Sequence, residues 1–226
     1  MMLFRIFFTL TIFSFATLVF AIDEYDAIEF RELNLSLIAA AKDGDIDRVR
    51  QRLEEGASVK ARNRFGNTAL ISATRVGNLD IVKLLVEKGS SVDMVNTNAE
   101  TALMNAASGG HEDIVDYLIN NNANISKLSV KNTSALMEAV FAGHPSIVKT
   151  LLKFYADVSV EDHLGKTTLN YAAAKGNVEI IQMLVEHGAD INRQSENNLT
   201  SLMWAAGYGK TEAVEILLKL GLAEVD

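Results

Sequence analysis

The sequence predicts an all-α solenoid of stacked helix-turn-helix units with protruding β-turn fingers, because three features recur at a constant step of 33 residues. The first is a hydroxyl residue followed by a small or polar residue and leucine, at Thr68-Ala-Leu70, Thr101-Ala-Leu103, Ser134-Ala-Leu136, Thr167-Thr-Leu169 and Thr200-Ser-Leu202. The second is glycine, at Gly44, Gly77, Gly110, Gly143, Gly176 and Gly209. The third is leucine, at Leu85, Leu118, Leu151, Leu184 and Leu217. A constant period of this length is typical of stacked repeat proteins.

Residues 68–100 illustrate how one unit is predicted to fold. Thr68 stands where an N-cap hydroxyl would accept a hydrogen bond from the first turn of a helix, and Gly77 can end that helix in the left-handed conformation. A second helix should begin near Leu79 and stop at Gly89, after which an extended stretch and a turn lead to the next unit. Helices this short fall below the ~12–15 residues at which an isolated helix is marginally stable, so neighbouring units must supply the core.

These motifs resemble ankyrin repeats. The clearest match is the stretch 176–192, with the sequence GNVEIIQMLVEHGADIN, and the resemblance extends over residues 35–226. It implies units with an L-shaped section and a concave groove lined by the inner helices and the turn tips. It also implies a binding module with no chemistry of its own, and therefore neither an enzyme nor a cofactor protein.

The sequence departs from the family pattern at three positions of the unit. The proline after the anchor hydroxyl residue is replaced by Ala69, Ala102, Ala135, Thr168 and Ser201. The family histidine, whose hydrogen bond to the anchor threonine is thereby lost, is replaced by Ile71, Met104, Met137, Asn170 and Met203. The turn glycine is kept at Gly66 and Gly165 but becomes Asn132, Asn198 and Ala99. Alanine does not easily adopt the left-handed conformation, so we expect the turn at Ala99 to differ.

The first 21 residues have the layout of a secretory signal peptide. Arg5 precedes an apolar stretch at 6–20, and small residues at Val19 and Ala21 predict cleavage after Ala21. The alternative is an uncleaved membrane anchor, although the apolar stretch is shorter than the ~20 residues that span a bilayer.

The predicted organisation after the leader is a short extension followed by one continuous repeat domain. Residues 22–34 form an acidic N-terminal extension, and the sequence leaves open whether it lengthens the first helix. The repeat domain covers 35–226, divided into a polar N-terminal cap repeat, four full repeats and a C-terminal cap repeat, at 35–67, 68–100, 101–133, 134–166, 167–199 and 200–226.

Composition excludes several classes of function. The net charge is −8, and it becomes −9 once Arg5 is removed with the leader, which argues against a nucleic-acid-binding surface. The chain has no cysteine, so disulfides, thiolate catalysis and thiolate metal sites are excluded. A chain with this charge is biased towards basic partners.

No catalytic, cofactor or metal site is predicted. Residues 43–54 imitate a calcium-binding loop, but Arg48 stands where such a loop needs glycine, and Gly44 is in phase with the repeat glycines. The four histidines do not share one structural position, and the sequence has neither a glycine-rich phosphate loop nor a nucleophile elbow.

The predicted binding site is the concave groove, whose residues differ from repeat to repeat. By the resemblance, the candidate partner-binding residues are Arg75, Asn105, Glu138, Phe141, Tyr171, Lys175, Trp204 and Tyr208. Tryptophan and tyrosine are the residues most often found as binding hot spots. The alternative is that Trp204 and Tyr208 shield the last repeat. Four acids either attract a basic partner or form a solvated face, namely Glu100, Glu138, Glu161 and Asp162.

The predicted function is therefore an exported, non-catalytic module that binds another protein, with no nucleic acid or small-molecule cofactor as partner. A leader without cysteines fits the bacterial periplasm best, and a secreted or membrane-anchored protein is the alternative. Two roles remain open within this class: an inhibitor or immunity partner, and a helper of an envelope enzyme. If the leader is retained, the chain is instead a membrane-anchored structural scaffold.

Overall fold

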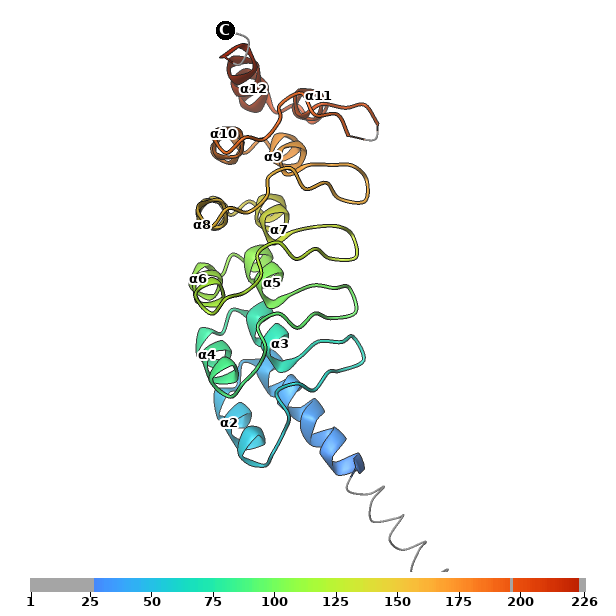
Figure 1. The fold of residues 1–226 in the computed structure, drawn as a ribbon, viewed down its shortest axis with the longest axis vertical. Coiled ribbons are helices and arrows are strands. Elements are labelled where there is room, and N and C mark those ends of the chain that lie inside the picture. The colour runs from blue at the N-terminus through green and yellow to red at the C-terminus, as the bar shows by residue number, and fades with distance from the viewer. Residues whose placement is uncertain (1–26, 196, 224–226) are drawn as a thin grey trace, which may run out of the picture.

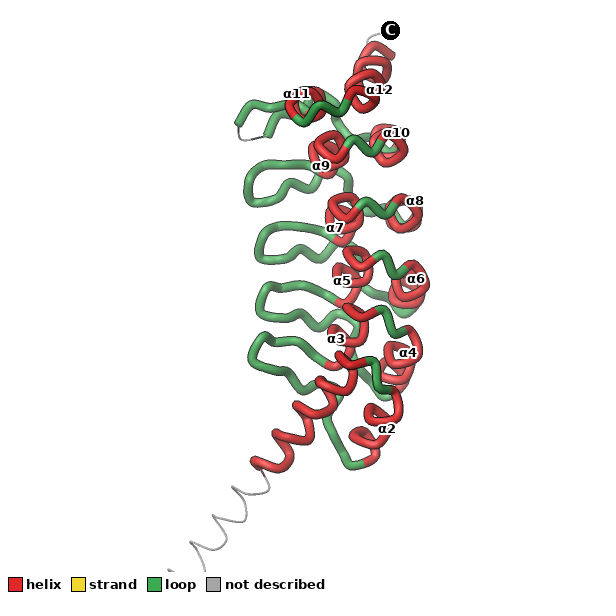
Figure 2. Tube along the Cα trace, turned by 180° about the vertical axis from the view of Figure 1, so that it is seen from behind, coloured by secondary structure: helices red, strands yellow, loops and turns green. Residues whose placement is uncertain are grey.

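The computed structural model describes residues 27–195 and 197–223, and it confirms the all-α solenoid. Helix pairs stack along one axis, and long turns project from the stack on one side (Figures 1 and 2). The predicted leader at 1–21 lies outside the described residues. Within the described part, no helix is both long enough and apolar enough to cross a bilayer.

Each unit contributes an inner helix next to the projecting turns and an outer helix behind it (Figure 2). The inner helices are α3 (Ala69–Val76), α5 (Ala102–Gly109), α7 (Ala135–Ala142), α9 (Thr168–Lys175) and α11 (Ser201–Gly207). The outer helices are α2 (Ile46–Glu54), α4 (Leu79–Glu87), α6 (Glu112–Asn120), α8 (Pro145–Lys153), α10 (Val178–Glu186) and α12 (Thr211–Ala223). A helix over residues 27–43 precedes α2 and projects beyond the end of the stack (Figure 1), so the described part of the acidic extension continues this helix.

The anchor hydroxyl residues cap the inner helices as predicted. Each accepts a hydrogen bond from the backbone N–H three residues later, as in the 3.2 Å bond from Ile71 to Thr68 and the 3.3 Å bond from Asn170 to Thr167. The other three caps are Thr101, Ser134 and Thr200. The glycines that end α3, α5, α7 and α9 all have φ between 76° and 85°.

The core runs through the whole stack as one cluster of buried apolar side chains. Its period is that of the sequence, since the periodic leucines of α4, α6, α8, α10 and α12 are almost fully buried, at Leu85, Leu118, Leu151, Leu184 and Leu217. Each unit therefore buries its apolar face only against its neighbours, which is what short helices require in order to persist.

The projecting turns, which we call the fingers, are linked to one another by backbone hydrogen bonds. The N–H groups of Thr97, Val130 and His163 donate to carbonyl oxygens of the preceding finger over 3.1, 2.9 and 3.0 Å. Within a finger, one polar side chain accepts hydrogen bonds from the backbone: Asn96 Oδ1 accepts from Asn98 and Glu100 over 2.9 and 3.0 Å. The fingers thus form a ladder that follows the stack.

The expectation that the turn at Ala99 differs is wrong. Ala99 has φ 57°, and its N–H donates to the carbonyl of Asn96 over 3.0 Å, just as Gly66 donates to Asn63 over 2.8 Å. The side chain of Asn96 holds this turn closed and imposes on alanine a conformation that costs roughly 1–2 kcal/mol. Tertiary and side-chain contacts thus override the local preference.

The lost threonine–histidine hydrogen bond is replaced in one repeat. Asn170 Oδ1 accepts from the backbone N–H of Thr167 over 2.9 Å, while Thr167 caps the N–H of Asn170, which forms a reciprocal capping box. Asn170 Nδ2 also donates to Ser201 Oγ over 3.0 Å, which ties α9 to α11. Three side-chain hydrogen bonds therefore hold the start of α9.

Candidate protein-binding groove

The surface between the inner helices and the fingers contains two regions of different character. Five of the eight predicted groove residues meet in one cavity near the C-terminal end, formed by α7, α9, α11 and the adjoining turns. The other three lie on α3, α5 and α7 towards the N-terminal end, where polar side chains contact one another. We call these regions the aromatic cavity and the polar network.

The aromatic cavity has a volume of about 400 Å³, and its lining residues are Phe141, Lys166, Asn170, Tyr171, Ala174, Lys175, Trp204, Tyr208 and Lys210. Phe141 and Tyr171 pack edge to face with ring centroids 5.5 Å apart. Trp204 and Tyr208 stack with centroids 5.9 Å apart and an interplanar angle of 15°. Both arrangements are favourable for aromatic pairs, so the rings form a preorganised wall.

Lysines lie on this wall. The Lys166 ammonium is 4.5 Å from the Trp204 ring centroid and 5.7 Å from that of Tyr171, and the Lys175 ammonium is 4.5 Å from that of Phe141. Such contacts contribute about 0.5–1 kcal/mol at exposed sites. Lys210 packs its stem over Gly176, where an added Cβ would lie 2.8 Å from its Cδ. None of the three lysines forms an ion pair with a carboxylate of the described residues.

A buried carboxylate supports one aromatic side of the cavity. Asp162, which is only 6% exposed, accepts a 2.5 Å hydrogen bond from the Tyr171 hydroxyl. Burial by itself would raise the pKa of Asp162, but this hydrogen bond and those from the backbone N–H groups of Lys166 and Leu164 lower it below its ordinary value. Burial, together with the bond to Asp162, raises the pKa of Tyr171. The pair therefore holds one charge in a fixed place and orients the Tyr171 ring.

Trp204 carries a further polar group with no partner among the described residues, because its buried Nε1 makes no hydrogen bond. An unsatisfied buried donor is uncommon in native proteins. Trp204 is also the single tryptophan of the chain, so its fluorescence reports on this cavity alone.

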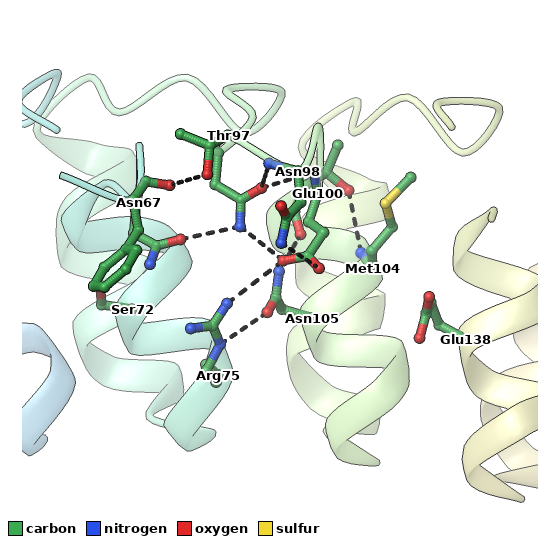
Figure 3. Close-up of polar contacts among 12 residues, drawn as sticks. Asn67, Ser72, Arg75, Thr97, Asn98, Glu100, Met104, Asn105 and Glu138 are labelled. Atoms are coloured by element: carbon green, nitrogen blue, oxygen red, sulfur yellow. Dashed lines mark hydrogen bonds and ion pairs between the residues drawn. The ribbon is translucent and has the colours of Figure 1, made fainter. Parts of the chain in front are cut away.

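The polar network is satisfied from within (Figure 3). Arg75 donates from Nε to Asn105 Oδ1 over 3.1 Å and lies 3.6 Å from the Glu100 carboxylate. Asn96 Nδ2 donates to Glu100 Oε2 over 2.7 Å and to Asn67 Oδ1 over 3.1 Å. Two predicted contact residues, Arg75 and Asn105, therefore use their polar groups to join neighbouring repeats.

Family comparison agrees with this architecture. A family model described as ankyrin repeats (3 copies) matches residues 36–129, 77–162 and 136–226, which together cover the chain from 36 to its end. The chain belongs to the ankyrin repeat family. No curated protein sequence matches it. Ankyrin repeats are general protein–protein interaction modules and are typically not catalytic.

The four acids that were predicted to attract a basic partner or to form a solvated face all contact other residues of this ankyrin repeat protein. Glu138 accepts a 2.9 Å hydrogen bond from the Thr133 hydroxyl, and Glu161 pairs with Arg193 at 2.5 Å. Glu100 belongs to the polar network and Asp162 holds Tyr171. Each carboxylate thus has a partner inside the fold.

The eight predicted contact residues do not include the other four residues that line the aromatic cavity, namely Lys166, Asn170, Ala174 and Lys210. The repeat step contained a signal for two of them. Lys166 directly precedes the anchor Thr167, and Lys210 directly follows Gly209, where the earlier repeats have aspartate, asparagine or histidine. Within residues 27–195 and 197–223, no group of three or more His, Cys, Asp or Glu side chains is placed to hold a metal ion.

Proposed function

We propose that this ankyrin repeat protein is exported and binds a segment of a partner protein in the aromatic cavity. The observation that carries the proposal is the convergence of Phe141, Tyr171, Trp204 and Tyr208, from three consecutive inner helices and the turn after them, on one cavity of about 400 Å³. Cavities of this size hold small ligands or side chains, and tryptophan and tyrosine are the side chains that contribute most to binding.

Exposure supports binding over the alternative that Trp204 and Tyr208 shield the last repeat. Tyr208 is 60% exposed, and Trp204 is only partly buried. A shielding side chain lowers the free energy by removing its own apolar surface from water, which these two do only in part. A partner segment that covered them would remove the rest.

The leader supports export as part of the same proposal. Residues 1–21 have the layout of a signal peptide, and the absence of cysteine suits an oxidising compartment such as the bacterial periplasm. In that setting the module would either inhibit its partner or assist an envelope enzyme. N-terminal sequencing of the protein recovered from cell fractions tests export: a mature chain beginning at Ile22 in the soluble envelope fraction is expected, and an intact leader in the membrane fraction would favour the anchored scaffold.

Site-specific cross-linking tests the cavity directly. A photoreactive benzoylphenylalanine replaces Tyr208 in one variant and Tyr155, which is 93% exposed, in a matched control. Cross-linking in living cells should yield a defined adduct from position 208 that is absent from position 155. An adduct from position 155 alone, or equal adducts from both positions, would show that the partner does not bind specifically at the aromatic cavity.

A further inference from the structure

We infer that the aromatic cavity selects an acidic protein segment, in which an apolar side chain enters the cavity and flanking carboxylates meet Lys166, Lys175 and Lys210. This inference rests on the proposed function and specifies the chemistry of the partner. It runs against the expectation from net charge, because a chain of charge −8 is biased towards basic partners.

The three lysines come from different parts of the fold but reach one cavity. Lys166 lies at the end of a finger, Lys175 ends α9 and Lys210 precedes α12. Contact with aromatic rings holds two of the ammonium groups at the wall, 4.5 Å from the centroids of Trp204 and Phe141. An ammonium group has three donors, and a ring face satisfies none of them by a conventional hydrogen bond, so each remains able to bind a carboxylate.

None of the neighbouring acids of the described residues lies within ion-pair distance of these lysines. Asp162 directs its oxygens at the Tyr171 hydroxyl and at two backbone N–H groups, and Glu161 pairs with Arg193. Glu138 accepts from Thr133. The cavity therefore combines aromatic walls with three lysines that have no ion-pair partner among the described residues, whereas the polar network pairs its cation Arg75 with Glu100.

The shape and the charge favour a protein segment over other anions. A volume of about 400 Å³ accommodates one or two side chains, and only three lysines surround it. Nucleic acids and anionic bilayers require an extended basic surface, and the rest of this chain is acidic. A short segment with carboxylates beside an apolar anchor matches both the size and the sign of the site.

Selection from a random displayed peptide library tests this inference with the full chain as bait. Trp204→Ala serves as counter-selection bait, because it removes the cavity wall. We expect the enriched peptides to carry two or more Asp or Glu residues beside an aromatic or aliphatic residue. Neutral or basic enriched peptides would overturn the inference and leave the proposed function in place. The absence of any peptide that prefers the native chain to Trp204→Ala would count against both.

A titration then assigns the carboxylates to the lysines. The enriched peptide and its Glu→Gln counterpart are titrated while the fluorescence of Trp204 is recorded. The affinity for the acidic peptide should fall roughly 5-fold in each of three single variants, Lys166→Gln, Lys175→Gln and Lys210→Gln, as expected for the loss of a partly exposed ion pair. The affinity for the Gln peptide should be the same in these variants as in the native chain. Lys153→Gln, on the outer helix α8, is the matched control and should have no effect.

Two further arms complete the test. Arginine at the same three positions should retain the affinity for the acidic peptide, because the charge and the ring contact persist. Single-stranded DNA and anionic phospholipid vesicles should leave the Trp204 signal unchanged. Equal binding of the acidic peptide by the three Gln variants and the native chain, or a stronger response to DNA or vesicles than to the peptide, would overturn the inference.

Discussion

The polar network and the aromatic cavity occupy corresponding parts of the same repeating backbone, yet they differ in what their side chains leave unsatisfied. Asn105 and Tyr171 both stand four residues after an anchor threonine. Asn105 accepts a hydrogen bond from Arg75 and joins two repeats, whereas Tyr171 presents its ring to a cavity with lysines on its wall. The repeat fixes the position of a side chain, and binding capacity arises where neighbouring repeats leave part of its surface open to a cavity.

The largest expected effect is on the affinity for the partner protein, which should depend on the aromatic cavity and not on the polar network. Trp204→Ala should weaken binding of the partner recovered through position 208 by about 30-fold or more, because a central aromatic hot spot contributes at least about 2 kcal/mol. Arg75→Ala should change the affinity by less than about 2-fold, since Arg75 already binds within the chain. Isothermal titration of both variants measures the contrast. Equal losses would show that the partner covers both regions.

The second effect concerns stability, for which we expect the polar network to matter more than the aromatic cavity. Glu100→Ala removes the ion-pair partner of Arg75 and leaves one N–H of the buried Asn96 side chain without its acceptor, so the free energy of unfolding should fall by about 1–3 kcal/mol. Tyr208→Ala should change it by less than about 0.5 kcal/mol, because the ring is largely exposed. Urea unfolding followed by circular dichroism compares the two. A larger loss for Tyr208→Ala would mean that the exposed ring serves the fold, as in the shielding alternative.

The backbone of both regions follows from the sequence, because it depends on local chemistry. Thr68 and Thr167 cap helices and Gly77 and Gly176 end them by interactions within a few residues, which the 33-residue step displays directly. Ala99 was misjudged because its intrinsic preference was considered without the Asn96 side chain that holds the turn.

The side-chain partnerships could not be predicted in the same way. Lys166, Lys175 and Lys210 belong to three different positions of the repeat, so no single periodic column contains them. Their convergence depends on side-chain direction and on the packing of Lys210 over Gly176. Likewise, the pairing of Arg75 with Asn105 joins residues 30 apart in the sequence, and composition alone does not distinguish it from a free groove residue.

The third effect is a dependence of stability on pH that arises from the Asp162–Tyr171 pair of the aromatic cavity. The folded-state pKa of Asp162 lies below its ordinary value of 3.8, so the stability that it contributes is fully present above 3.8 and is lost as the pH falls through the folded-state pKa. The amide oxygen of Asp162→Asn can still accept hydrogen bonds from the backbone N–H groups of the finger, as Asn96 Oδ1 does in the polar network. The variant cannot ionise, so its stability should depend less on pH in the acid range. Urea midpoints measured across the acid range for both chains check the difference. An unchanged acid limb in Asp162→Asn would assign the acid dependence to other carboxylates.

The same pair predicts an alkaline limb. Because the folded-state pKa of Tyr171 is raised above its ordinary value of 10.0, its contribution is present below 10.0 and is lost as the pH rises towards the folded-state pKa. Tyr171→Phe should remove this limb, because the ionising group is gone, and should weaken the acid limb, because the Tyr171 hydroxyl is one of the donors that lower the pKa of Asp162. The absorbance of tyrosinate during an alkaline titration follows the ionisation of the tyrosines. If every tyrosine ionised near pH 10.0, the result would contradict the hydrogen bond between Tyr171 and Asp162.

The smallest effect compares a finger from each region. Ala99→Gly should raise the free energy of unfolding by about 0.5–1 kcal/mol, because the relief of the left-handed strain exceeds the entropy that glycine adds to the unfolded chain. Gly165→Ala, in the finger that carries Asp162 and with φ 65°, should lower it by a similar amount. If the polar network imposes the conformation of Ala99, then Glu100→Ala should diminish the gain from Ala99→Gly, and a double-mutant cycle measures this coupling. Strict additivity of the two changes would show that the Asn96 turn closes without help from Glu100.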